Sequence, residues 1–247
     1  MAFQDHFSAH AADYAYARPG YPSAMLDWLT DQCQHTDLAW DCATGNGQVA
    51  VPLTNRFQRI IASDASRQQL AHAQAHDRIQ YCQCLAEQPS LADTSVDLVT
   101  VAQALHWFDI DKFFAAVDRV LRGKGILAVW SYDVCHVAPP IDAQISHFYH
   151  EVVGPYWPPE RELVANRYES IQFPYAQIAV PEFNMQRDWS CEQLCHYLAS
   201  WSATRRCREA AGKDPIPQLF AELQSHWPQG LKKTVSWPLT VVVCRKN

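Results

Sequence analysis

The sequence predicts a doubly wound α/β fold with a mostly parallel, seven-stranded sheet. Short apolar runs alternate with stretches of helical length through the first half of the chain, and this alternation is typical of parallel sheets. A chain of 247 residues that is 48% hydrophobic can bury a complete core. We therefore expect one enlarged domain, residues 1–247, rather than two small ones.

Seven apolar runs are the expected strands, at 38–42, 59–64, 78–83, 96–102, 125–132, 183–189 and 235–245. Helices are expected between the first five strands, at 48–57, 66–76 and 109–121. Asp109 is the expected cap of the third of these helices, and Ser190 is the expected cap of a later one. Pro238 requires a bend or bulge in the last strand, because proline cannot donate to a sheet.

Residues 134–181 differ in composition from the first half of the chain. They contain seven prolines among many aromatic residues. One long helix is excluded by the prolines, and the segment is too apolar for a flexible linker. We interpret it as an inserted cap over the ligand-binding edge of the sheet.

The charge and the hydropathy of the chain argue against nucleic-acid and membrane partners. The formal net charge is −6, and the basic residues are scattered, which argues against a nucleic-acid partner but leaves a local patch open. No apolar run is long enough to span a membrane, and the first residues lack the apolar core of a secretory signal.

The nine cysteines include no CxxC pair, so we expect free thiols and a cytoplasmic protein. Cys191 and Cys195 beside His196 have a spacing that metal ligands use, but no second ligand pair accompanies them. We expect no metal.

The most informative stretch is 38–48, an apolar strand that runs through Asp41 into a turn with Gly45 and Gly47. Glycines let backbone amides approach a ligand closely. A nicotinamide dinucleotide site has a third glycine, but it also tolerates the alanine found at position 50, so this cofactor stays open.

The next strand ends in Asp64. An acid at this point accepts the ribose hydroxyls of either a nicotinamide dinucleotide or S-adenosylmethionine. The alternative is that Asp64 only caps the helix that begins near Ser66.

The motifs at 41–47, 64, 86–87 and 95–109, taken in order, resemble those of the class I S-adenosylmethionine-dependent methyltransferases, which have a Rossmann-like sheet. More narrowly, the chain is similar to the type 11 branch that includes trans-aconitate methyltransferase-like proteins. The segment 7–22, with Tyr14, Arg18 and Tyr21, is similar to the N-terminal segment of that branch. The resemblance is dense over residues 3–132 and weakens through 134–180.

The resemblance implies S-adenosylmethionine as cofactor and assigns roles by position. The loop from Asp41 through Gly45 and Gly47 would hold the methionine part, with Gln103 close to it. Asp64 and the adjoining Ala65 would lie by the ribose, and Ala86 and Glu87 by the adenine. Tyr14, Arg18 and Tyr21 would belong to a lid, residues 1–22, over the cofactor.

Two positions depart from the family pattern. Ala43 replaces the usual first glycine of the loop, and we expect it to suit only a backbone with negative φ. Pro52 falls just beyond the first turn of the following helix, where it costs a hydrogen bond.

Methyl transfer from a sulfonium needs alignment and exclusion of water more than it needs a protein nucleophile. His106 is the candidate base for a hydroxyl, phenol or amine acceptor, whereas a carboxylate acceptor needs none. The alternative is that His106 and Trp107 only shape the site.

The expected acceptor pocket contains Trp107, Tyr132, Trp157 and Trp201, with Arg205 and Arg206 as counter-charges for an acid. Core packing accounts equally well for each aromatic residue, and a solvated helix face accounts for each arginine. The favoured reaction is O-methylation of a small organic acid. A nicotinamide oxidoreductase and a non-catalytic adenosylmethionine-binding protein are the alternatives; the first leaves residues 103–107 unexplained.

Overall fold

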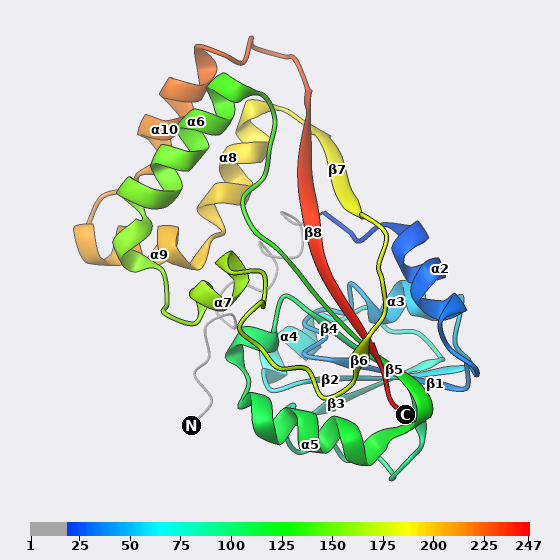
Figure 1. Cartoon of the computed structure of the whole chain (residues 1–247). Coiled ribbons are helices and arrows are strands. Elements are labelled where there is room, and N and C mark those ends of the chain that lie inside the picture. The colour runs from blue at the N-terminus through cyan, green and yellow to red at the C-terminus, as the bar shows by residue number, and fades with distance from the viewer. Residues whose placement is uncertain (1–18) are drawn as a thin grey trace.

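The computed structural model describes residues 19–247 and shows a twisted sheet with a layer of helices over one end (Figure 1). The strand order is β3-β2-β1-β4-β5-β8-β6, and β7 pairs with β8 outside this path. All seven predicted strands are present, and the two-residue strand β6 (Ala176–Gln177) is an eighth that the sequence did not predict.

The first five strands form the parallel half of the sheet. They are β1 (Leu38–Cys42), β2 (Arg59–Asp64), β3 (Ile79–Gln83), β4 (Val96–Ala102) and β5 (Leu121–Tyr132). From β1 the chain winds outward to β2 and β3, then crosses back to continue on the other side through β4 and β5. This reversal opens a crevice at the carboxyl ends of β1 and β4, the usual ligand site in such sheets.

Helices cover both faces of these strands. Leu38, Trp40 and Cys42 pack in one apolar cluster with α5 (Ile110–Val120), whereas Ala39 packs in the opposite one with α2 (Ser23–Asp31). Every residue of β1 is buried, which is why the strand has a continuous apolar run instead of an alternating one.

The helices nearest the crevice are shorter than predicted. They are α3 (Ala50–Leu53) and α4 (Arg67–Ala71), where the sequence predicted 48–57 and 66–76. Pro52 lies inside α3 and supplies no backbone donor, which weakens that helix. By contrast, Asp109 caps α5 as predicted, through a bond from the N–H of Lys112.

The antiparallel part of the sheet is organised by one long strand, β8 (Lys233–Arg245). Its first half pairs with β7 (Asn184–Trp189), and its second half pairs with β5 and, at the end, with β6. Pro238 is the last residue paired with β7, and Leu239 is the first paired with β5. Of the expected bend or bulge, the bulge is wrong, because both pairings stay in register and proline falls where the strand changes partners.

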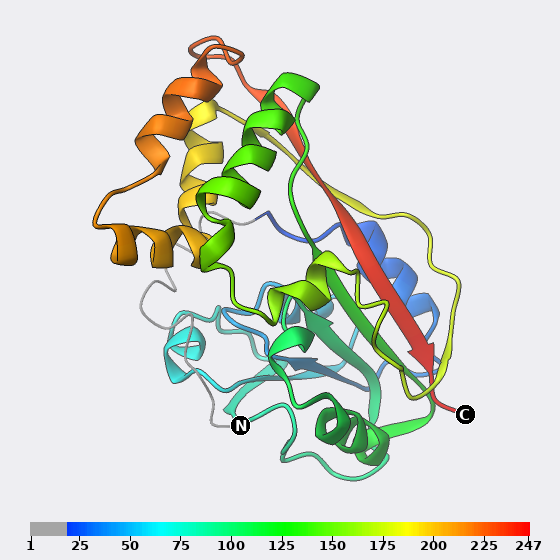
Figure 2. The ribbon, with the colours of Figure 1, turned by 60° about the vertical axis from the view of Figure 1, so that its left-hand side comes forward.

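A helical cap with its own core lies over the sheet. Figures 1 and 2 show α6 (Pro139–His147), α8 (Cys191–Ala199) and α10 (Ile216–Gln224) side by side, with α9 (Ser202–Ala211) below them. Their buried faces share one apolar cluster, which includes Ile145, Leu198 and Leu223. Ser190 caps α8 as predicted, and Gln193 completes a capping box with it.

The cap draws on two stretches of chain, whereas the sequence predicted 134–181 alone. That segment supplies α6, the short helices η3 (Phe148–Val152), η4 (Gly154–Tyr156) and α7 (Arg161–Ala165), and β6. The helix that Ser190 begins, α8, was predicted, but its place in the cap was not, and α9 and α10 were not named. An amphipathic helix does not show in its sequence which layer it covers.

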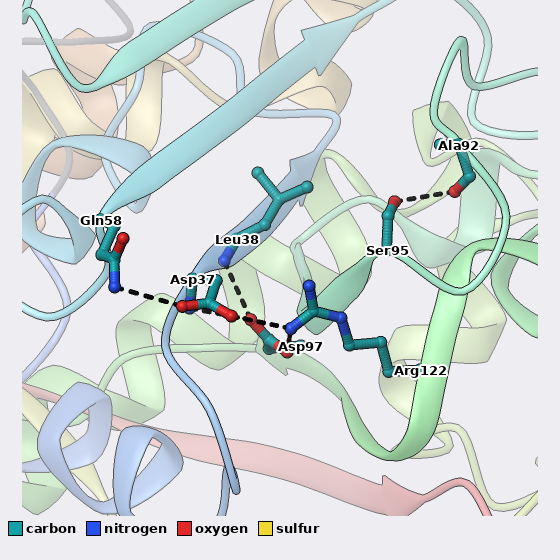
Figure 3. A network of polar contacts seen from close by, with 7 residues as sticks. All are labelled: Asp37, Leu38, Gln58, Ala92, Ser95, Asp97 and Arg122. Carbon is teal, nitrogen blue, oxygen red and sulfur yellow. Dashed lines mark hydrogen bonds and ion pairs between the residues drawn. The ribbon is translucent and has the colours of Figure 1, made fainter.

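A polar cluster fixes the end of the sheet away from the crevice (Figure 3). Asp97, which is 3% exposed, accepts the backbone N–H groups of Asp37 and Leu38 over 2.9 Å each. Arg122 donates to Asp97 and to Asp37, over 2.7 Å and 3.0 Å. The cluster locks the start of β1 to β4 and so sets how the opposite ends of these strands meet.

Within residues 19–247 no helix has the length and apolar character needed to cross a bilayer. The nine cysteines, all of which fall in this range, are free thiols.

Candidate functional site

A loop with three left-handed residues follows the central strand β1. Ala43, Gly45 and Gly47 have φ values of 55°, 59° and 90°. The expectation that Ala43 requires negative φ is wrong: this alanine adopts a left-handed conformation, at a cost of about 1–2 kcal/mol. Two features exclude a side chain at Gly47: its positive φ, and Oη of Tyr81, which would lie 2.5 Å from a Cβ placed there.

Asp41 lies enclosed beneath this loop. It is 1% exposed, and its carboxylate accepts the hydroxyl of Thr44 over 2.5 Å and that of Thr100 over 2.7 Å. Burial raises the pKa of Asp41 from 3.8 to about 6, although both hydroxyl bonds act in the opposite direction. An enclosed carboxylate in this position acts by holding the shape of the loop. Neither threonine was singled out in the sequence.

Asp64 joins the loop to the end of β2. Its Oδ2 accepts the N–H of Gly45 over 2.9 Å, and its Oδ1 accepts the N–H of Ser66 over 2.8 Å. The hydroxyl of Ser66, not Asp64, caps α4 by accepting the N–H of Gln69. The cap interpretation of Asp64 therefore does not account for its position beside the glycine loop.

The residues expected near the adenine lie on the neighbouring loops. Ala86 is buried, and Glu87 accepts the N–H of Asp109 over 2.9 Å. The carbonyl of Ala65 accepts the amide of Gln83 over 3.0 Å. These hydrogen bonds connect the loops that follow β2, β3 and β4 at the carboxyl end of the sheet.

Gln103 follows β4 directly, and its φ is 55°. Its side-chain amide donates to the carbonyl of Tyr132 over 2.7 Å, so the ends of β4 and β5 are fastened together. The glycine loop, the acid at the end of β2 and this amide together fit S-adenosylmethionine. Gly45, Gly47, Asp64 and Gln103 would hold it, with Asp41 in support.

A cavity lies between Gln103 and the helical cap. The residues that line it come from both layers: Gln103, His106, Trp107, Tyr132, Asp133, Trp157, Pro158, Arg161, Tyr197, Ser200, Trp201 and Ser202. The four aromatic residues predicted for the pocket, Trp107, Tyr132, Trp157 and Trp201, are all among them. The centroids of the Trp157 and Trp201 rings are 5.5 Å apart, which gives the cavity an aromatic wall.

The charged side chains of the cavity are ones that the sequence analysis missed. Arg205 and Arg206 lie on α9 and are not part of the lining. Arg161, at the start of α7, lines the cavity and forms an ion pair with Asp133. Asp133 could have been found from the sequence, because it is an acid at the end of a predicted strand, as Asp64 is. No sequence pattern pointed to Arg161.

His106 is 7% exposed and reaches the cavity from the short helix η2 (Leu105–Trp107). Its Nδ1 lies 3.3 Å from the hydroxyl of Tyr168, and its ring centroid lies 4.7 Å from that of Trp107. Burial, and then the positive charge of Arg161, lower the pKa of His106 from 6.5 to about 3. The imidazole is therefore neutral near pH 7.

Of the residues expected in a lid, Tyr21 packs edge-on against Trp130, with ring centroids 5.4 Å apart. Tyr14, Arg18 and most of the expected lid 1–22 lie outside the described residues.

Comparisons with known proteins identify the family. A family model described as a methyltransferase domain matches residues 40–129, which run from β1 into β5. A protein of Dictyostelium discoideum described as a methyltransferase is 32% identical over 253 residues, or 99% of this chain and 96% of the relative. The methyltransferase cfoB of Aspergillus candidus is 28% identical over 223 residues, or 78% and 68% of the two chains.

A solved structure extends the likeness beyond the sheet. A protein from Anaeromyxobacter dehalogenans, described as a type II methyltransferase, has a TM-score of 0.87 at 33% identity and covers 92% of this chain and 97% of that one. A match of this extent includes the helical cap as well as the cofactor loop. The nicotinamide alternative is thereby set aside. The chain belongs to the class I S-adenosylmethionine-dependent methyltransferases.

Proposed function

We propose that the protein methylates a carboxylate oxygen of a small organic acid held in the aromatic cavity. One observation supports this acceptor most directly: the cavity beside Gln103 combines aromatic walls with the guanidinium of Arg161. Aromatic side chains pack well against a small planar molecule, and guanidinium groups bind carboxylates through directed hydrogen bonds. The resemblance to trans-aconitate methyltransferase-like proteins favours the same class of acceptor.

The protein's part in this reaction is alignment. The cofactor supplies an activated methyl carbon, which an oxygen lone pair attacks in line. Gln103 fixes the ends of β4 and β5 beside the loop that would hold the methionine part of the cofactor. The cap closes the opposite side of the cavity with Trp157, Tyr197 and Trp201 and so limits the access of water.

A carboxylate acceptor agrees with the electrostatics of His106. A carboxylic acid is already ionised near pH 7, so no proton has to be removed before attack. A neutral imidazole then serves to orient the acceptor by a hydrogen bond. A phenol or amine would need a base with a pKa close to the working pH, which a pKa of about 3 does not provide.

We also place the protein in the cytoplasm, with small molecules rather than nucleic acids as partners. Nine free thiols suit a reducing compartment. The net charge of −6 gives no general attraction to phosphate backbones.

The test is a panel of acceptors incubated with the protein and S-adenosylmethionine, followed by mass spectrometry. Small carboxylic acids are expected to gain the mass of a methylene group, and phenols and amines are not. Turnover of phenols or amines alone would refute the acceptor class and leave the methyltransferase assignment intact. Tight cofactor binding without any transfer across the panel would favour a non-catalytic binding protein.

A further inference from the structure

The guanidinium of Arg161 is fixed in the cavity by aromatic rings. Its Cζ lies 5.1 Å from the ring centroid of Trp157 and 6.0 Å from that of Tyr149. The side chain is 16% exposed, and its Nε is buried with no hydrogen-bond partner among the described residues. Trp157 is itself held by a bond from Nε1 to the carbonyl of Tyr149, over 3.3 Å. Cation–π contact and burial therefore set the position of this charge.

The carboxylate that pairs with Arg161 is held less firmly. The side chain of Asp133 is 42% exposed, and its Oδ1 accepts both Arg161 and, over 3.4 Å, the hydroxyl of Tyr149. Asp133 directly follows the last residue of β5, so rotation about its side-chain bonds can carry the carboxylate into solvent while the sheet stays in place. The fixed member of the pair is the cation, and the movable member is the anion.

From this asymmetry we infer that Asp133 is a specificity-determining residue that occupies the acceptor's place on Arg161. Asp133 neutralises the buried guanidinium, whose charge would otherwise be costly to bury. A carboxylate-bearing acceptor replaces Asp133 on Arg161, while the planar body of the acceptor packs against Trp157 and Trp201. The inference rests on the proposed function for the chemical class of the acceptor.

Replacement of the Asp133 carboxylate by that of the acceptor explains how the cavity selects an acid. A neutral molecule of the same shape cannot replace the charge of Asp133, so it must bind with the ion pair in place and with less room. An acid exchanges one carboxylate for another and gains the aromatic contacts. Asp133 therefore lowers affinity for every acid and excludes those that lack a planar body to compensate.

The test compares Asp133→Asn with the wild type, using benzoate and its neutral counterpart benzamide as probes. Binding is followed by calorimetry in the presence of saturating adenosylhomocysteine. We expect Asp133→Asn to bind benzoate about tenfold more tightly than the wild type, because Arg161 no longer has a competing anion. Benzamide affinity is expected to change by less than about twofold. Asp133→Ser is a second variant with the same expected direction, in case the amide takes over the hydrogen bonds.

A matched control is available on the cap. Asp214 pairs with Arg208 at 3.0 Å, and its side chain is 42% exposed, as that of Asp133 is. Asp214→Asn removes the same charge outside the cavity and is expected to leave benzoate affinity unchanged. Equal or weaker benzoate binding by both Asp133 variants would overturn the inference, since Asp133 would then orient Arg161 for the acceptor. Tighter benzoate binding without methyl transfer to any acid would keep the inference and refute the proposed reaction.

Discussion

The backbone N–H of Gly45 donates to Oδ2 of Asp64 over 2.9 Å. This bond joins the loop after β1 to the last residue of β2, so the part of the site that would hold the methionine group and the part that would hold the ribose are one unit. The same carboxylate also accepts the N–H of Ser66. Changes at Asp64 are therefore expected to alter cofactor binding through both contact and loop shape.

Asp64→Ala is expected to weaken adenosylhomocysteine binding by about 1–3 kcal/mol, through loss of charge-assisted hydrogen bonds. Calorimetric titration measures this loss. Ser66→Ala is the matched control, because it removes the cap of α4, at about 1 kcal/mol of stability, and leaves the carboxylate in place. If the two variants bind adenosylhomocysteine equally well, Asp64 only supports α4 and does not contact the cofactor.

Gly47→Ala is expected to destabilise the protein for two separable reasons. The new Cβ would lie 2.5 Å from Oη of Tyr81, and φ is 90°. We expect a loss of about 2–4 kcal/mol in urea unfolding. Adding Tyr81→Phe removes the contact and leaves the backbone strain, so the double variant should recover about half of the loss. Full recovery would mean that the φ of Gly47 imposes no cost, which would contradict the left-handed loop.

The pKa of Asp41 predicts how stability depends on pH. Its folded value is raised to about 6 from 3.8, so between these values the folded protein holds a proton that the unfolded chain has released. Asp41 therefore contributes most stability at low pH and loses it as pH rises through about 6, by roughly 3 kcal/mol. Asp41→Asn removes this dependence.

The measurement is the difference in unfolding free energy between Asp41→Asn and the wild type, at a series of pH values. The difference should shift by about 3 kcal/mol in favour of the variant between about pH 4 and pH 7. The comparison is needed because His106 has the opposite effect: its lowered pKa makes stability fall as pH drops below 6.5. A difference that is constant with pH would show that folding does not raise the pKa of Asp41.

His106 is expected to orient the acceptor without titrating. With a pKa of about 3 it stays neutral throughout the working range, so the kcat/KM profile for an acid acceptor should show no inflection near 6.5. His106→Asn keeps a hydrogen-bonding group and should lower kcat/KM by less than about tenfold, with an unchanged profile. An inflection that disappears in His106→Asn would identify this residue as a base.

The sheet could be predicted closely because its signal is local. The strands β1, β2 and β4 have the predicted bounds, since strands buried on both faces appear as unbroken apolar runs. Helix lengths could not be predicted so well: α3 and α4 are shorter than predicted, and Pro52 removes a backbone donor inside α3. The two-residue strand β6 has no sequence pattern of its own.

The lining of the proposed acceptor cavity was predictable in part. Four of the five Trp and Tyr residues that line it could be named, because aromatic residues are concentrated around the ends of strands and in the cap; Tyr197 was not named. Arg205 and Arg206 were chosen for their nearness to Trp201 in sequence. However, Trp201 lies just before α9 and packs against Trp157, whereas Arg205 and Arg206 lie further along that helix. The cation that lines the cavity, Arg161, is 28 residues from its partner Asp133, and only the folded chain brings them together.

Incubation of the protein with S-adenosylmethionine and a planar carboxylic acid, with both products followed, tests the proposed O-methylation. We expect adenosylhomocysteine and an alkali-labile methyl ester in equal amounts, both lost in Arg161→Gln. An alkali-stable methylated product, or full ester formation by the Arg161→Gln protein, would contradict it.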